Sequence, residues 1–260
     1  MKVEAIEKHL HALLKVTDGV EGLEYGDYTA DVKKIVVCWM ATTDALRYAL
    51  EQGANLVLAH EALFYPYPGI RGGLPPADHM AWPANRRRLE LMAQGRLSVV
   101  RVHGALDRTR LRAAFADALE LPPPVVDREY YIKIHELPPT PIRALVDHVK
   151  RCVGVDYARV TPCDPARVVR RVGLAFGGLG LFVNVSAQAE LMKHSPEVLI
   201  GGESDAYGFI FAIEAGVVFI ETGHEVSENI GLRPFAAELG RSLPGIPVLY
   251  YENPRPWNVW

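Results

Sequence analysis

The sequence predicts an α/β fold made of two similar α/β halves related by a pseudo-twofold axis, and three observations support this. Short apolar runs without polar alternation recur along the chain, as they do in strands buried on both faces of a parallel sheet. Segments with the apolar spacing of helices separate these runs. The two halves also repeat one order of features: a buried strand, a histidine, a carboxylate four residues later and an amphipathic helix.

The first half begins with helical spacing over residues 3–16, which a turn at 17–22 ends. The apolar run 34–40 predicts a buried strand, and a helix is expected over 45–52 after candidate N-cap residues. The run Leu56–Ala59 predicts the next strand. Strand, helix and strand together indicate a parallel βαβ unit with a right-handed crossover.

His60 and Glu61 directly follow the run Leu56–Ala59. In open parallel sheets the carboxyl ends of the strands face the ligand crevice, and an imidazole beside a carboxylate suits a divalent metal there. Taken alone, such a pair is more often a histidine bonded to backbone beside a solvated glutamate. Two further donor pairs in similar settings shift the interpretation towards metal binding.

Residues 66–83 hold five prolines and three glycines and predict a long loop. A loop of this length inside a compact domain is usually functional or mobile, so a lid or subunit contact and a plain surface excursion are both compatible with it. A helix is expected over 85–94 and a strand over 97–102. His103 follows that strand, and Asp107 shares its face if a helix begins at once; otherwise Asp107 is a helix N-cap, the more common role for such a residue.

The second half is expected to start after the prolines at 122–124, which gives halves of 1–121 and 122–260 that form one compact unit. Glycines at 177, 178 and 180 indicate a tight turn first and an anion site second. The run 216–220 leads to His224 and, four residues on, Glu228. The expected strands are 130–135, 172–176, 198–200, 216–220 and Val248–Tyr251, with helices within 138–154, over 185–193 and around 235–239.

A duplicated unit places two strand-end sites around the pseudo-twofold axis, and their donors are expected to converge on one cleft between the halves. Three histidines and three carboxylates suffice for two metal ions with positions open to water or substrate. The candidate ligands are His60, Glu61, His103, Asp107, His224 and Glu228.

The bulk composition limits the other function classes. A net charge of −3 gives no sign of a nucleic-acid surface, and the three cysteines lack metal-type spacing and read as reduced thiols. The charged N-terminus lacks the apolar segment of a signal peptide, and no apolar run reaches the roughly 18 residues of a membrane span. We expect a cytoplasmic protein that binds neither nucleic acid nor membrane.

Three motifs resemble one known family, the Nif-three-like dinuclear metal-binding proteins, also named GTP cyclohydrolase 1 type 2 homologues. The family's strand ending in His-His stands here as AHEALFY, its His-x-x-x-Asp motif as HGALD and its Gly-His-x-x-x-Glu motif as GHEVSE. The resemblance implies the family's two-half α/β fold and a ring-shaped homohexamer with the metals facing an inner cavity. By motif position it implies that His60, Asp107, His224 and Glu228 are ligands.

Glu61 stands where the family commonly has a second histidine. A carboxylate there would favour harder ions such as manganese, iron or magnesium, would leave one site weaker, or would act as a base beside a single metal. His103 is either a ligand or the partner of a ligand.

The leading functional prediction is a dinuclear metal-dependent hydrolase whose two divalent ions (iron, manganese, zinc or magnesium) share a bridging water. Asp107 and Glu228 are the expected bridging carboxylates, and Glu61 is a ligand or the catalytic base. The substrate is an unidentified small molecule, with nucleotides as one candidate class, since the GTP cyclohydrolase label follows only from the family's name. The alternative is a non-catalytic metal-binding oligomeric scaffold or regulatory protein; the third possibility is that the cluster binds nothing.

Overall fold

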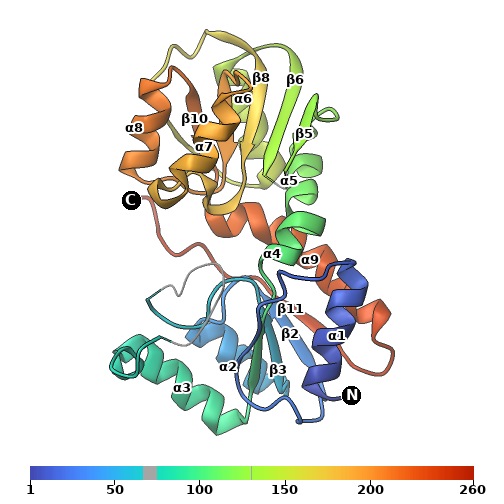
Figure 1. The fold of residues 1–260 in the computed structure, drawn as a ribbon. Coiled ribbons are helices and arrows are strands. Elements are labelled where there is room, and N and C mark those ends of the chain that lie inside the picture. Colours follow the sequence, from blue (N-terminus) through green and yellow to red (C-terminus); the bar gives the residue numbers. More distant parts are fainter. Residues whose placement is uncertain (67–74, 130) are drawn as a thin grey trace. The chain divides into compact units, whose positions relative to one another are not determined.

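A computed structural model describes residues 1–66, 75–129 and 131–260, and its strands form two separate sheets (Figure 1). The chain divides into two compact units. The first unit comprises Met1–Arg110 and Leu232–Asn253, and the second comprises Leu111–Gly231 and Pro254–Trp260. The halves 1–121 and 122–260, which the sequence divides at the prolines 122–124, remain a prediction as structural domains.

The first unit contains a five-stranded sheet in the order β1-β4-β3-β2-β11. β2, β3, β4 and β11 run parallel, and β1 pairs antiparallel with β4. Its elements are α1 (Val3–Leu14), β1 (Gly22–Tyr25), β2 (Ile35–Cys38), α2 (Thr43–Glu51), β3 (Leu56–Ala59), the 3-10 turn η1 (His79–Ala81), α3 (Pro83–Gly95), β4 (Ser98–Arg101), α4 (Gly104–Leu106) and β11 (Val248–Tyr251).

The predicted βαβ unit is confirmed, because β2 and β3 pair in parallel and α2 connects them. Every residue of β2, β3 and β4 is buried, which accounts for the absence of polar alternation in their sequences. Thr42 is the N-cap of α2 and accepts the backbone N–H of Ala45 at 3.2 Å. β11 lies at the C-terminal end of the sequence, yet it pairs with β2 in the first sheet.

The second unit contains a six-stranded sheet in the order β5-β6-β8-β9-β10-β7, in which β8, β9 and β10 run parallel. Its elements are α5 (Arg112–Ala118), β5 (Val126–Arg128), β6 (Ile132–Pro141), α6 (Ile142–Val153), β7 (Arg159–Val160), β8 (Val168–Ala175), the 3-10 turns η3 (Gly177–Leu179) and η4 (Phe182–Asn184), α7 (Val185–Met192), β9 (Val198–Gly201), α8 (Ala206–Glu214) and β10 (Val218–Glu221). The π-helical turn η2 (Asp107–Leu111) and the helix α9 (His224–Ser242) contribute residues to both units.

The sequence analysis predicted no element for α8, whose nine residues are almost all apolar and show no polar face. A capping interaction starts this helix, because the Asp205 carboxylate accepts the backbone N–H of Gly208 at 2.8 Å. The loop predicted at 66–83 includes residues 67–74, which lie outside the described residues, so its role as lid, subunit contact or surface excursion stays open. No helix in the described ranges is long and apolar enough to span a membrane.

Candidate functional site

His60 and Glu61 lie in the turn that directly follows β3. The backbone N–H groups of both residues donate to the carbonyl of Trp39, at 3.0 Å for His60 and 2.7 Å for Glu61, which anchors the turn beside the end of β2. His60 Nδ1 lies 3.1 Å from the carbonyl oxygen of Val102. Because a carbonyl only accepts, Nδ1 carries a proton and the neutral ring keeps its lone pair at Nε2, the usual arrangement in a metal-ligating histidine.

Two charged side chains, one buried and one partly buried, support the same turn. Arg101 in β4 is fully buried and donates from Nε to the His60 carbonyl at 3.3 Å. Glu24 in β1 accepts the backbone N–H of Leu63 at 2.7 Å. Burial raises the pKa of Glu24, and the Leu63 N–H and the Arg101 charge oppose this increase. These contacts fix the backbone of the turn and therefore the direction in which His60 is presented.

His103 and Asp107 lie in the turn that follows β4, the neighbouring parallel strand. His103 is the N-cap residue of α4, and the Asp107 N–H donates to the His103 carbonyl at 3.1 Å. A helical turn therefore begins directly after His103 and places both side chains on one face, so the interpretation of Asp107 as a helix N-cap is wrong. The Glu21 carboxylate accepts the backbone N–H groups of His103 at 2.6 Å and Gly104 at 3.1 Å.

These two turns bring four predicted residues of the first unit together, and we call them the first donor group: His60, Glu61, His103 and Asp107. His60 Nε2 lies 3.4 Å from Asp107 Oδ1. His103 lies between the two carboxylates, with Nδ1 3.6 Å from Asp107 Oδ2 and Nε2 3.7 Å from Glu61 Oε1. The two imidazole rings stack at 4.4 Å between centroids.

The spacing of the first donor group fits a divalent ion. Metal–nitrogen and metal–oxygen bonds of about 2.0–2.2 Å place neighbouring ligands of one ion about 3 to 3.5 Å apart, close to the separations between these donors. One ligand atom from each of His60, Glu61 and His103 also lies within 4.8 Å of the other two. Mixed imidazole and carboxylate donors suit iron, manganese or zinc.

His224 and Glu228 form the second donor group, which lies in the second unit. β10 ends at Glu221, and His224 is the first residue of α9. The helical spacing of four residues puts Glu228 on the face of His224, with His224 Nε2 3.2 Å from Glu228 Oε1. His224 Nδ1 lies 2.9 Å from Glu203 Oε2. This carboxylate orients the ring and raises its basicity, as in the carboxylate–histidine–metal triads of metalloproteins.

Gly177, in the turn after β8, gives the second donor group its space. A Cβ atom at this position would lie 2.2 Å from Glu228 Oε1, and the φ angle of +56° also favours glycine. The tight turn predicted for the glycine group is confirmed as the 3-10 turn η3. The absence of a side chain at Gly177 lets the buried carboxylate of Glu228 approach the backbone.

Sequence reasoning missed the side chains that position these donors, among them Glu21 and Glu203. Glu203 follows β9, just as His224 follows the neighbouring parallel strand β10. This placement after a strand end was the signal available in the sequence. Glu21 gave no such signal, because its partner His103 is 82 residues away in the chain.

Comparison with known proteins identifies the family. The family model described as Duf34/NIF3 (NGG1p interacting factor 3) matches residues 1–256. The chain belongs to the Duf34/NIF3 family. This confirms the resemblance seen in the three motifs.

Relatives within the Duf34/NIF3 family carry cyclohydrolase names. A Chlamydia pneumoniae protein named GTP cyclohydrolase 1 type 2 homolog is 24% identical over 270 residues, which cover 99% of this chain and 100% of the relative. A Helicobacter pylori protein named GTP cyclohydrolase 1 type 2 is 25% identical over 237 residues, which cover 90% of this chain and 88% of the relative.

The crystal structure of a Bacillus cereus protein related to NIF3 matches with a TM-score of 0.78 and 15% identity, covering 100% of this chain and 99% of that one. At this identity the match shows the fold, and it confirms the predicted α/β class.

Proposed function

We propose that this Duf34/NIF3 protein is a dinuclear metal-dependent hydrolase that acts on a small molecule. The observation that carries the proposal is the first donor group, in which two imidazoles and two carboxylates from adjacent strand ends stand at separations of 3.4 to 3.7 Å. The stability of a sheet edge does not require two imidazoles and two carboxylates at the spacing of metal ligands.

The first donor group would supply His60, Glu61, His103 and Asp107 to bound metal, and the second would supply His224 and Glu228. Divalent ions held there lower the pKa of coordinated water and stabilise the negative charge that develops during hydrolysis. Within the protein, Val102 and Glu203 keep the protons of His60 and His224 on Nδ1, so that Nε2 of each ring stays available.

Glu61 is a ligand or the base that takes a proton from water. Its side chain is 10% exposed, and Oε1 lies 3.7 Å from His103 Nε2. An oxygen donor at this position shifts the metal preference towards manganese, iron or magnesium.

The relatives' names make GTP the first substrate to test, and other nucleotides follow as the wider class. The homohexamer implied by the family resemblance and the cytoplasmic location are parts of the same proposal. Light scattering of the purified protein tests the hexamer.

Elemental analysis of purified, undialysed protein tests the metal centre. We expect close to two equivalents of divalent metal per chain, with a sharp decrease in His60→Ala and in His224→Ala. The control is His194→Ala, a partly exposed histidine outside both donor groups. Absence of metal, even after incubation with manganese, iron or zinc, would overturn the proposal.

An assay of the metal-loaded protein then separates the hydrolase from the alternative, a non-catalytic scaffold. The hydrolase predicts turnover of GTP or another nucleotide that stops in Glu61→Gln while bound metal persists. Metal retained without turnover of any compound in a broad hydrolase substrate panel would favour the scaffold.

A further inference from the structure

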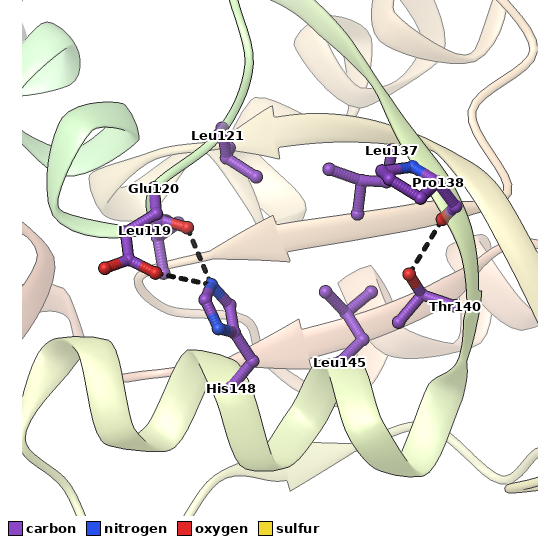
Figure 2. A pocket seen from close by; sticks show the side chains of 8 residues that line it. All are labelled: Leu119, Glu120, Leu121, Leu137, Pro138, Thr140, Leu145 and His148. Atoms are coloured by element: carbon purple, nitrogen blue, oxygen red, sulfur yellow. Dashed lines mark hydrogen bonds and ion pairs between the residues drawn. The ribbon is translucent and has the colours of Figure 1, made fainter.

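A further group of side chains that could hold a metal ion lies in the second unit and shares no residue with the first or second donor group. Its members are Glu120, His148 and Cys152, each with a ligand atom within 4.8 Å of the others. His148 and Cys152 are four residues apart on α6 and therefore share a face of that helix. Glu120 comes from the turn after α5, which packs against this face (Figure 2).

The separations are those of ligands around one tetrahedral ion. Cys152 Sγ lies 3.4 Å from His148 Nε2, and Glu120 Oε2 lies 3.8 Å from the same nitrogen. Bond lengths of about 2.3 Å to sulfur and 2.0–2.2 Å to nitrogen and oxygen, at the tetrahedral angle, give edges of about 3.4 to 3.6 Å. The carbonyl oxygen of Leu119 lies 2.9 Å from His148 Nε2 and is a fourth donor within reach.

Glu120 and His148 line a cavity of about 220 Å³, which gives a further ligand access to an ion held between them. Figure 2 shows the His148 ring directed towards Glu120 at one end of this cavity. The rest of the lining is mainly apolar: Leu119, Leu121, Leu137, Pro138, Thr140 and Leu145. The apolar wall lies on one side of the site, and the Glu120 side chain stays largely exposed to solvent.

The hydrogen bonds at His148 define what metal binding must change. Arg151 donates to Nδ1 at 2.9 Å, so the proton of the neutral ring is on Nε2, which donates to the Leu119 carbonyl. Binding through Nε2 requires the single ring proton to move to Nδ1, by exchange with solvent, and releases the thiol proton of Cys152. Arg151 is exposed, so its guanidinium can move into solvent when Nδ1 carries this proton and no longer accepts a hydrogen bond.

Without metal, Cys152 is a thiol. Burial raises its pKa, the Glu120 carboxylate adds to the increase and Arg151 opposes it. A raised pKa disfavours a nucleophilic role, which requires thiolate at neutral pH. A bound cation removes this penalty, because a coordinating thiol is deprotonated.

We propose that Glu120, His148 and Cys152 form a separate site for a thiophilic divalent ion of the zinc class. The donors proposed for the hydrolase centre contain no sulfur, so the two kinds of site select different ions: nitrogen and oxygen ligands for the hydrolase, and a sulfur-containing set here.

Cobalt titration tests this site, because thiolate–cobalt coordination gives a charge-transfer absorption in the near ultraviolet that histidine and carboxylate ligands do not give. The reduced, metal-free protein is titrated with Co²⁺ alone. We expect one equivalent of cobalt–thiolate absorption in the wild type, its loss in Cys152→Ser and an affinity at least tenfold lower in His148→Asn. Zinc added afterwards abolishes the absorption in the wild type.

Cys163→Ser is the matched control, since Cys163 is a partly buried free cysteine of the same unit. It keeps the absorption if the assignment is right. Absence of the absorption in the wild type, or its persistence in Cys152→Ser, would overturn the proposal. Circular dichroism identifies a variant that fails to fold, and His148→Asn then provides the second test. Failure of the hydrolase centre would leave this result unchanged, because its donors cannot produce the signal.

Discussion

The two donor groups proposed to hold metal are built in different ways. In the first unit, four donors come from turns after two adjacent parallel strands, and main-chain contacts to Glu21, Glu24 and Arg101 hold those turns. In the second unit, two donors share one turn of α9, and a side-chain carboxylate, Glu203, orients the histidine. The first group keeps three donors when one is removed, whereas the second keeps only one.

The largest effect should follow from removing a histidine of the smaller group. His224→Ala leaves Glu228 as the only member of the second donor group, whereas His103→Ala leaves three donors in the first. We expect the affinity for Mn²⁺ to fall more than a hundredfold in His224→Ala and about tenfold in His103→Ala, because the second donor group has two members and the first has four. Isothermal titration with Mn²⁺ measures both.

Both variants should keep their fold, because these ligands lie at strand ends outside the apolar core. Thermal unfolding of the metal-free proteins is the control. A larger loss of affinity in His103→Ala than in His224→Ala would reverse the comparison between the two groups.

Removing the charge of the orienting carboxylate should have the next largest effect. Glu203→Gln keeps the size of the side chain and weakens its interaction with His224 Nδ1, now 2.9 Å from Oε2. Loss of such a partner lowers metal affinity by about 10- to 100-fold. Mn²⁺ titration measures the change, and Glu190→Gln, on the surface of α7, is the control. Equal affinities in the two variants would mean that Glu203 has no orienting role.

Gly177→Ala should have a smaller effect that acts on both the fold and the metal. The new Cβ would lie 2.2 Å from Glu228 Oε1, so Glu228 must move away from its place beside His224. We expect a free energy of unfolding lower by about 2 kcal/mol and a Mn²⁺ affinity lower by about tenfold.

Gly154→Ala separates the two causes in that variant. Gly154 has a similar φ of +70°, and nothing lies within 4 Å of an added Cβ. It therefore measures backbone strain alone, at about 1 kcal/mol, with no change in metal affinity. A metal affinity that falls equally in both variants would rule out the contact with Glu228 as the cause.

The sequence predicted which of these side chains lie together, because strand ends and short-range spacing determine their positions. The boundaries of β3 and β11 match the prediction, and the spacing of four residues correctly placed Asp107 beside His103 and Glu228 beside His224. These features depend only on local geometry, namely the end of an apolar run and the turn of a helix.

The supporting residues were beyond sequence reasoning because their partners are distant in the chain. Glu21 and Arg101 act on residues 82 and 41 positions away, and β11 joins the first sheet from the far end of the sequence. α8 was missed for another reason, since its apolar residues occur on all sides and give no periodic signal.

The smallest effect should follow from a change in the backbone support of the first donor group. Glu21→Gln replaces one of two accepting oxygens with an amide that cannot accept the N–H of His103 or Gly104. We expect a free energy of unfolding lower by about 1–2 kcal/mol, measured by urea denaturation against Glu51→Gln on the exposed surface of α2. The Mn²⁺ affinity should fall only about threefold, because the remaining oxygen and the other three donors hold the turn. If the Mn²⁺ affinity fell as far as in Glu203→Gln, support of the main chain would position the donors as strongly as a carboxylate bonded to the imidazole ring. The two groups would then differ only in their number of donors.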